Sequence, residues 1–476
     1  MNTNLDDVYA GDQELCDLGV DALREGFESG KFDPVAVIEA VQARVQACEP
    51  TLNALWQPNF GAAHHEAEQS AKRWVARTTK GPLDGVPVTV KENIGRRGVP
   101  MPHGTAAGTP DVPTQDAPIT QRLLESGAII FSSTVMPDWG MLSSGVSSLH
   151  GISRSPIDPR LTTGGSSAGA GASAAAGYGP IHFGSDIGGS IRLPGTWLGL
   201  AAFKPSFGRI PLDGPYMGRV AGPLARRVSD VRWAMRVVGR PDVRDYSELP
   251  VYVGDYQGDF QPTHACIAIL PSAGCGEAVD PDVAEALRRV ADLLANAGAK
   301  VEEIGAFMDD GILADVDRFL RVRSWIDYAT LPVADQRKVL PYIVEWCRAG
   351  ADIPGSEVLR CYQEIQRMRQ LTIAATVSFD FVLSPVAPMA AFPAEWPMPF
   401  HDATGPMQHI GFTVPYNMSE QPAISVHAGF TRDHRTVGVQ LAGRRFDDPG
   451  VLAVAEWIET HLKVAWPERT VGRSDK

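Results

Sequence analysis

The sequence has few of the features that direct a protein to a membrane or to nucleic acid. Its 476 residues contain no apolar run that approaches the roughly 18 residues needed for a membrane-spanning helix. The formal net charge is −13, and the longest basic clusters are adjacent pairs such as Arg226-Arg227 and Arg444-Arg445. Because phosphate binding needs clustered cations, we expect no nucleic-acid partner and no membrane partner.

Cysteine is scarce as well, and its placement excludes the common metal and disulfide patterns. No C-x-x-C motif and no ligand spacing beside a histidine pair occurs among the six cysteines: Cys16, Cys48, Cys266, Cys275, Cys347 and Cys361. We expect reduced thiols, no bound metal and no cofactor. The acidic N-terminus, MNTNLDDVYAGDQELCDLG, lacks the apolar stretch of a secretory signal, which predicts a cytoplasmic protein.

What the sequence does contain is a mixture of apolar strands and amphipathic helices from end to end. With 44% hydrophobic and 21% charged residues, its composition is that of a folded, enzyme-sized protein. The predicted elements include a helix with an apolar stripe over 15–27, a helix that starts at the cap Asp33-Pro34, a strand over 86–90 closed by Lys91, and a strand over 128–133. This mixture predicts an α/β fold in which helices cover both faces of a sheet.

The most unusual segment is TTGGSSAGAGASAAAG, residues 162–177, which allows several interpretations. Its glycine and serine content is that of a flexible linker, although the alanine-rich end favours a helix. The G-x-G-x-x-A pattern at 169–174 fits a loose dinucleotide-binding fingerprint, but no predicted strand precedes it. The G-x-S-x-A pattern at 164–168 approaches the nucleophile elbow of α/β-hydrolases, which would require a late histidine such as His427 or His434.

A further interpretation takes this segment together with its neighbours. PVTVKENI precedes it and FGSDIGGSIRLPG follows it, so that Lys91 lies 75 residues before Ser166, and Ser190 lies 24 residues after Ser166. These three motifs in this order resemble the amidase signature family of serine hydrolases, as do GPLDGVPVTVKEN, GLAAFKPSFGRIP and QPAISVHAG. The resemblance therefore covers most of the chain.

The resemblance implies a fold and a domain organisation. One domain would span residues 1–476, built on a large twisted mixed β-sheet with helices on both faces. Its parts would be a core signature at about 86–230, a mostly helical segment at about 310–377, and C-terminal strands and a helix at about 380–465. This agrees with the α/β fold expected from the strand and helix pattern alone.

The resemblance also assigns a catalytic triad. Ser190 would attack the carbonyl carbon of the substrate, Ser166 would relay the proton, and Lys91 would be the base. A lysine accepts a proton only when it is neutral, so its pKa must fall from about 10.4 to near 7.5. Burial at the end of an apolar strand is expected to produce this change.

Supporting positions follow from the same resemblance. It implies a cis peptide bond between Gly165 and Ser166, and an oxyanion hole made by the backbone N–H groups of Ile187, Gly188 and Gly189. Ser167, Asp186 and Arg192 match positions that orient the triad and the oxyanion loop, although from the sequence alone they could be ordinary turn residues. We expect His182 to be a core histidine, and Asp138 to be a cap or turn residue.

Two segments bear on the substrate pocket. Where many relatives read GKTNM-x-E, this chain reads SSTVMPDW, and its apolar and aromatic residues either line the pocket or pack in the core: Met136, Trp139, Met141 and Leu142. The proline-rich segment 385–399 is either a linker or a loop packed on the body or over the pocket. Its Phe392 and Trp396 suit the packed loop.

The resemblance implies hydrolysis of amide C–N bonds, and the apolar candidates near Ser190 favour aryl or alkyl amides, anilides, carbamates (urethanes) or esters. Its expected partners are a small amide or carbamate and water, and we expect a monomer or a homodimer. A rival within the family is the glutamine-hydrolysing A subunit of a tRNA-dependent amidotransferase, which would need a charged pocket for an amino acid. A non-catalytic binding protein is disfavoured, because Lys91, Ser166 and Ser190 are all present.

Overall fold

A mixed β-sheet forms the centre of the protein in the computed structural model, which describes residues 15–472. Its eleven strands run in the order β1-β3-β2-β6-β8-β7-β12-β13-β11-β9-β10. They are β1 (Leu55–Trp56), β2 (Pro87–Lys91), β3 (Ile129–Thr134), β6 (Ile181–Asp186), β7 (Ala201–Lys204), β8 (Val220–Ala225), β9 (Cys266–Ile269), β10 (Lys300–Glu303), β11 (Phe381–Pro385), β12 (Ala423–Phe430) and β13 (Thr436–Gly443). A separate two-stranded pair joins β4 (Val146–Ser147) to β5 (Gly151–Ile152).

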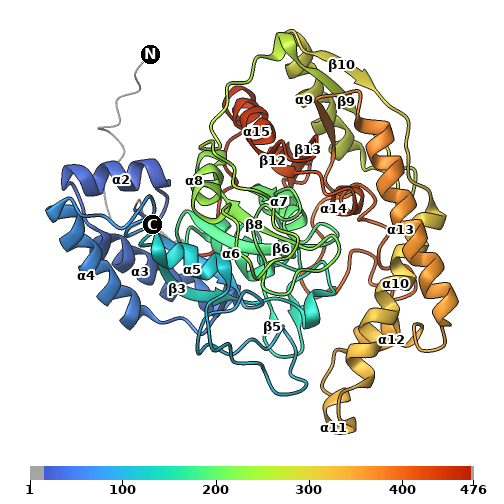
Figure 1. The fold of residues 1–476 in the computed structure, drawn as a ribbon, viewed down its shortest axis with the longest axis horizontal. Coiled ribbons are helices and arrows are strands. Elements are labelled where there is room, and N and C mark those ends of the chain that lie inside the picture. The colour runs from blue at the N-terminus through green and yellow to red at the C-terminus, as the bar shows by residue number, and fades with distance from the viewer. Residues whose placement is uncertain (1–14, 473–476) are drawn as a thin grey trace.

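Helices surround this sheet, with α2 to α4 at one end of the molecule and α10 to α13 at the other (Figure 1). They are α2 (Val20–Ser29), α3 (Pro34–Leu52), α4 (Phe60–Ala76), α5 (Pro118–Glu125), α6 (Ala168–Ala176), α7 (Arg192–Leu198), α8 (Val228–Val238), α9 (Pro281–Asn296), α10 (Asp310–Ala329), α11 (Val333–Gln336), α12 (Pro341–Arg348), α13 (Gly355–Thr376), α14 (Val414–Met418) and α15 (Asp448–Leu462). Two 3₁₀ turns span Asp138–Gly140 and Pro262–His264. Within residues 15–472, none of the helices combines the length and the apolar character needed to cross a membrane.

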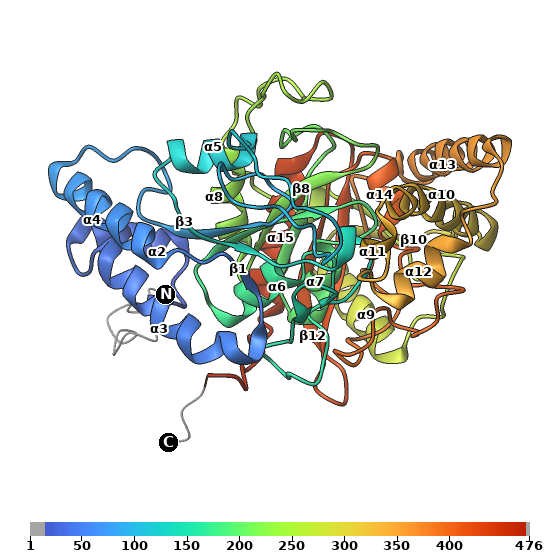
Figure 2. The same cartoon turned by 90° about the horizontal axis from the view of Figure 1, so that it is seen from below.

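Helices cover both faces of the sheet, which confirms the predicted fold class (Figure 2). On β7, Ala201 and Phe203 pack with the apolar residues of α8 and α15, whereas Ala202 packs with α6 and α7. Successive side chains of a strand point to opposite faces, so both faces of the strand are buried. The central strands are apolar at consecutive positions for this reason.

The first predicted helix starts later than its apolar stripe indicates. Leu15 and Leu18 fit the helical spacing, but α2 begins at Val20, after an extended Gly19 with φ −78° and ψ 171°. The N–H of Val20 donates to the buried carboxylate of Asp230 at 2.7 Å. This contact comes from far along the chain, so local periodicity does not reveal it. Of the N-terminal segment assessed for a secretory signal, residues 1–14 lie outside the described residues.

Three parallel strands determine where the candidate site lies. β2 pairs in parallel with β3 on one side and with β6 on the other, so the carboxyl ends of these strands meet at one edge of the sheet. β2 ends at Lys91, and β6 ends at Asp186, just before the glycine turn that leads to Ser190. In α/β sheets of this kind, ligands bind beyond the carboxyl ends of the strands.

Candidate active site

Lys91 lies at the end of β2 and is fully buried. Its Nζ donates hydrogen bonds to three hydroxyl oxygens, at 2.8 Å to Ser166, 3.2 Å to Ser167 and 3.2 Å to Ser185. Ser167 in turn donates to the backbone carbonyl of Ser185 at 3.1 Å. The lysine is therefore held by serines from two different segments, the start of α6 and the end of β6.

The environment of Lys91 favours the neutral amine. Burial, together with the positive charge of Arg219, lowers the pKa of Lys91 from 10.5 to about 7, while Glu92 and Asp186 act in the opposite direction. Removing a charged amine from water disfavours its ionisation, and no carboxylate within ion-pair distance compensates among the described residues. A lysine with this pKa can accept a proton near neutral pH.

Ser166 follows a glycine whose backbone packs closely against the Ser144 backbone. The Gly165–Ser166 peptide bond is cis, as the resemblance implies. A Cβ on residue 165 would lie 2.4 Å from the carbonyl oxygen of Ser144, so this position accepts only glycine. Helix α6 begins at Ala168, and all of its small residues are buried. The linker interpretation of residues 162–177 is therefore wrong.

The turn after β6 presents Ser190 and the predicted oxyanion loop. Gly189 has φ +123°, and a Cβ there would meet the hydroxyl of Thr413 at 2.8 Å. The N–H of Gly189 donates to the Asp186 carboxylate at 2.8 Å. It is thus already used inside the turn, and its role as an oxyanion donor stays a prediction. The N–H groups of Ile187 and Gly188 remain as candidates.

Arg192 and Asp186 form the buried centre of a network behind this turn. Both side chains are fully buried, and Arg192 donates to the Asp186 carboxylate at 2.9 and 3.1 Å. Burial opposes ionisation of Asp186, but the charge and hydrogen bonds of Arg192 outweigh it and hold the pKa of Asp186 below its usual range. Three further residues, absent from the sequence prediction, complete the network with hydrogen bonds to Arg192: Thr413, Asn417 and Gln440.

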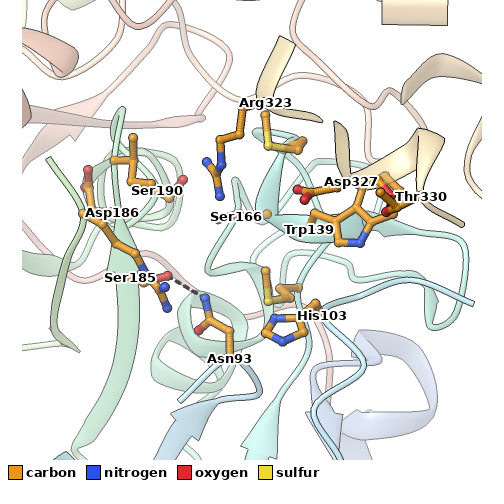
Figure 3. A pocket seen from close by; sticks show the side chains of 15 residues that line it. Asn93, His103, Trp139, Ser166, Ser185, Asp186, Ser190, Arg323, Asp327 and Thr330 are labelled. Carbon is orange, nitrogen blue, oxygen red and sulfur yellow. Dashed lines mark hydrogen bonds between the residues drawn. The ribbon is translucent and has the colours of Figure 1, made fainter. Parts of the chain in front are cut away.

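A cavity of about 410 Å³ opens in front of these residues (Figure 3). Ser166 and Ser190 both line it, although among the described residues no hydrogen bond joins their two hydroxyls. Three predicted pocket residues line it as well: Met136, Trp139 and Met141. Asp186 and Ile187, predicted as a supporting residue and an oxyanion donor, also line it, and the remaining lining is absent from the sequence prediction: Asn93, His103, Gly140, Ser185, Arg219, Arg323, Asp327 and Thr330.

A second, apolar cavity of about 60 Å³ adjoins Ser190. Its lining includes Leu142, the fourth predicted pocket residue, and methionines from distant segments: Met141, Met398, Met407 and Met418. Met398 belongs to the proline-rich segment 385–399, and its sulfur accepts a hydrogen bond from the N–H of Ser143 at 3.1 Å. That segment also packs through Phe392 against Trp197, so it is a packed loop that contributes to the pocket.

The two histidines required by an α/β-hydrolase elbow lie away from the site. His427 is inside β12, and His434 borders a different cavity, so neither lines the cavity of Ser166. Within the described chain, residues 153–166 form only isolated bridges, so the strand required before an elbow or a dinucleotide fingerprint is missing. Both of these interpretations are wrong.

His182 and Asp138 have the structural roles expected from the sequence. His182 is fully buried in β6, where its ring nitrogens contact the Thr89 hydroxyl at 2.8 Å and the Gly179 carbonyl at 3.1 Å. Burial lowers the pKa of His182 to about 3, so it stays neutral. Asp138 starts a 3₁₀ turn and accepts hydrogen bonds from the N–H and hydroxyl of Ser148.

A second buried lysine, Lys204, resembles Lys91 in its burial but not in its surroundings. It ends β7, and its Nζ donates to the carbonyl oxygen of Pro205 at 2.9 Å. Burial and the charge of Arg192 lower the pKa of Lys204 to about 7. Lys204 does not line the cavity of Ser166 and Ser190. It therefore serves as a natural control for the effects of burying a lysine.

Among the described residues, one group of side chains has the geometry of a metal site, but its carboxylates already form ion pairs. Asp315, Glu357 and Cys361 lie close enough together to share an ion. Arg360 forms ion pairs with both carboxylates, at 2.6 Å and 2.7 Å, and Arg318 forms another with Asp315. Their negative charges are thus already balanced by arginines. None of the six cysteines, all of which lie within residues 15–472, forms a disulfide.

The sequence and the fold are each similar to those of known proteins. A sequence model of the amidase family matches residues 36–452. The chain is 38% identical over 291 residues to an indoleacetamide hydrolase of Bradyrhizobium diazoefficiens, a match that spans 58% of this chain and 54% of that protein. It is 30% identical to an acylamidase of Rhodococcus erythropolis over 93% of this chain and 95% of the relative. It is 28% identical to the A subunit of a glutamyl-tRNA(Gln) amidotransferase from Synechococcus, over 94% and 97%.

Solved structures show the same fold. A 6-aminohexanoate cyclic dimer hydrolase complexed with substrate has a TM-score of 0.84 and 25% identity, covering 96% of this chain and 98% of its own. A bacterial aryl acylamidase of the amidase signature family has a TM-score of 0.82 and 22% identity, covering 93% and 96%. Because the family match spans most of the sequence and the fold is that of these solved enzymes, the chain belongs to the amidase family, the amidase signature hydrolases that act on amides.

Proposed function

We propose that the protein hydrolyses amides with Ser190 as nucleophile, Ser166 as proton relay and Lys91 as base. The observation that carries the proposal is the hydrogen bond from the buried Lys91 Nζ to Ser166 Oγ, at 2.8 Å, beside the cavity that Ser190 also lines. An unassisted serine hydroxyl is a poor nucleophile, and a neutral amine within hydrogen-bond reach activates it.

The reaction proceeds in two steps, acylation of Ser190 and hydrolysis of the acyl-enzyme. Neutral Lys91 takes the proton of Ser166 as Ser166 takes that of Ser190, and Ser190 Oγ bonds to the substrate carbonyl carbon. The C–N bond then breaks, the amine leaves with the proton returned through Ser166, and an acyl-enzyme remains on Ser190. Water repeats the sequence, releasing the acid and restoring Ser190.

The negative charge that develops on the substrate carbonyl oxygen is stabilised by hydrogen-bond donors. The N–H groups of Ile187 and Gly188 supply them, whereas that of Gly189 keeps the turn closed through Asp186. Thr413 donates its hydroxyl to the carbonyl of Gly188 at 2.6 Å, which restrains the orientation of the peptide groups around it. Asp186 and Arg192 act as positioning residues for this turn.

The substrates are amides with an apolar group, such as aryl or alkyl amides and anilides, and their carbamate or ester analogues. The apolar cavity beside Ser190, lined by Leu142 and four methionines, supports this class. The similarity to an acylamidase and to an aryl acylamidase points in the same direction. We further propose that the chain acts on its own in the cytoplasm, as a monomer or a homodimer, without a cofactor.

The triad is tested by single alanine variants assayed on an anilide such as N-hexanoyl-4-nitroaniline. Ser190→Ala and Lys91→Ala should each lose at least about 1,000-fold in kcat, and Ser166→Ala a comparable amount. Ser173→Ala is the matched control, because this buried hydroxyl in α6 has no partner among the described residues. Wild-type rates in Ser190→Ala or Lys91→Ala would refute the mechanism.

A second function, hydrolysis of glutamine for a tRNA-dependent amidotransferase, has one observation in its favour. The cavity is lined by Arg219, Arg323 and Asp327, which could hold the carboxylate and the amine of a free amino acid. The methionine-lined cavity beside Ser190 does not suit glutamine. Ammonia release from glutamine exceeding anilide cleavage, or copurification of a partner subunit, would favour this second function.

A further inference from the structure

Two arginines, Arg219 and Arg323, line the main cavity. Arg219 lies in the loop that enters β8, and Arg323 lies on α10. Within residues 15–472, neither guanidinium forms an ion pair or donates a hydrogen bond to protein. By contrast Arg321, on the same helix as Arg323, binds Asp317 at 2.5 Å and donates to backbone carbonyls including that of Trp346. The donors of Arg219 and Arg323 are therefore available to a ligand.

Tyr216 connects the two arginines and restrains them. The guanidinium of Arg323 lies over the Tyr216 ring, 4.7 Å from its centroid, and the N–H of Arg219 donates to the Tyr216 carbonyl at 2.9 Å. In Figure 3 the Arg323 side chain projects into the cavity, with Ser190 on one side and Trp139 on the other. Its positive charge is thus held near the proposed nucleophile.

Within residues 15–472 the carboxylates around the cavity form no ion pair with Arg219 or Arg323, although burial raises the pKa of Asp327 and the charge of Arg323 lowers it, so Asp327 offsets part of that charge. Asp186 is ion-paired with Arg192 at 2.9 Å. Asp327 follows Arg323 by one helical turn, but in the described chain it is exposed and beyond ion-pair distance of both cavity arginines. Burial lowers the pKa of Arg219, and the positive charge of Arg323 acts in the same direction, as expected for two cations that lie near each other. An anion between them would relieve this repulsion.

We propose that the natural substrates are amides in which one half is apolar and the other carries a carboxylate. The carboxylate binds Arg219 and Arg323 in the main cavity, and the apolar half occupies the adjoining methionine-lined cavity, which Ser190 and Arg323 also line. The planar guanidinium groups suit a carboxylate, which accepts paired hydrogen bonds from them. This inference rests on the proposed hydrolysis of amides at Ser190.

Two pairs of substrates test the inference, one for each half of the amide. N-hexanoyl-4-aminobenzoate is compared with N-hexanoyl-4-nitroaniline, because the nitro group has the shape of a carboxylate without its charge. The mono-4-nitroanilide of glutaric acid is compared with the 4-nitroanilide of pentanoic acid. For each pair the measured quantity is the ratio of kcat/KM for the charged member to that for the neutral member.

The variants are Arg219→Gln, Arg323→Gln and the conservative Arg323→Lys. In at least one pair, either glutamine variant should lower the ratio about 10- to 100-fold, the range expected for losing a charge-assisted hydrogen bond, and Arg323→Lys should restore part of it. Arg337→Gln is the matched control, since Arg337 is exposed and lies outside the cavity lining. Using ratios cancels any effect of Arg219 on Lys91, because both members need the same base.

The outcomes separate this inference from the function on which it rests. Equal effects of the arginine variants on both members of both pairs would overturn the carboxylate site while leaving amide hydrolysis intact. Hydrolysis that survives in Ser190→Ala would overturn the proposed function itself. If the arginine variants do not fold, the inference is tested by inhibition of the wild-type protein with 4-aminobenzoate. This inhibition should be competitive and should weaken as the salt concentration rises. Inhibition by 4-aminobenzoate that is no stronger than inhibition by 4-nitroaniline would overturn the inference.

Discussion

Raising the pH from about 6 to about 8 should raise kcat/KM about tenfold and then bring it to a plateau, because Lys91 accepts a proton only as the neutral amine. With a pKa of about 7, roughly a tenth of Lys91 is neutral at pH 6, half at pH 7 and nine tenths at pH 8. The lowered pKa, from 10.5 to about 7, corresponds to about 5 kcal/mol of preference for the neutral form. A neutral anilide such as N-hexanoyl-4-nitroaniline is the right substrate, since it does not titrate in this range.

Variants show whether Lys91 is the group responsible for this profile. Arg219→Gln removes a positive charge that lowers the pKa of Lys91, so the midpoint should move to higher pH. His103 also lines the cavity, but burial and Arg219 lower its pKa below its ordinary 6.5, so His103→Asn should leave a midpoint near 7 in place. Lys204→Met should also leave the midpoint of the pH profile near 7. A flat or falling profile between pH 6 and 8, or a midpoint that moves only in His103→Asn, would refute a lysine base.

Other predictions concern stability and positioning. Lys91→Met should abolish hydrolysis but stabilise the fold. The pKa of Lys91 is about 7 in the folded protein and 10.5 in the unfolded chain, so the unfolded chain binds the proton more tightly. Burying Lys91 therefore costs on the order of 4 kcal/mol of folding free energy at pH 7, and the cost falls as the pH rises toward 10.5. Thermal unfolding at pH 7 and 9.5 checks this, and a gain that grew with pH would contradict it. Lys204→Met should give a similar gain while activity is kept; loss of activity would assign Lys204 a role that we do not give it. Gly165→Ala places a Cβ 2.4 Å from the Ser144 carbonyl oxygen, so kcat should fall at least about 100-fold in protein whose circular dichroism spectrum shows that it is folded. An unchanged kcat would show that catalysis does not need the close contact between residue 165 and Ser144. Asn417→Ala removes the hydrogen bond that Asn417 accepts from Arg192 and the one that it donates to the Asp186 carboxylate, which should cost about 1–3 kcal/mol of stability and about tenfold in kcat with little change in KM. A lowered Tm with unchanged kcat would leave Asn417 a purely structural role.

The parts of the site that could be predicted from the sequence are those whose chemistry is concentrated in short motifs. Lys91, Ser166 and Ser190 are assigned by the resemblance to the amidase signature family, whose motifs here lie in glycine-rich segments or at the end of an apolar strand. The fold class followed from the alternation of helices and strands, because period and length reveal element type without knowledge of the partners. Local patterns were also sufficient for Asp33, which caps α3 by accepting from the N–H of Ala36.

The rest of the site depends on contacts that no spacing encodes. Asn417 and Gln440 bind Arg192 from more than 200 residues away, and Arg323 reaches the cavity from a helix at the far end of the sheet. The resemblance implies that the N–H of Gly189 is an oxyanion donor, but which acceptor this N–H meets in the structure is decided by the fold of the turn after β6. The start of α2 was misplaced for the same reason, because Asp230 caps it from another helix.

The three hydroxyls around Lys91 have a consequence for how a proton can pass through the site. An ammonium group donates three hydrogens, and the oxygens of Ser166, Ser167 and Ser185 receive them. A neutral amine donates two and accepts one, and a hydroxyl can turn its hydrogen toward the nitrogen by rotation about a single bond. The same cage therefore satisfies both charge states of the lysine without moving a heavy atom. Proton exchange at Lys91 then requires reorientation of O–H bonds alone, which a cage of carboxylates or backbone carbonyls would not permit.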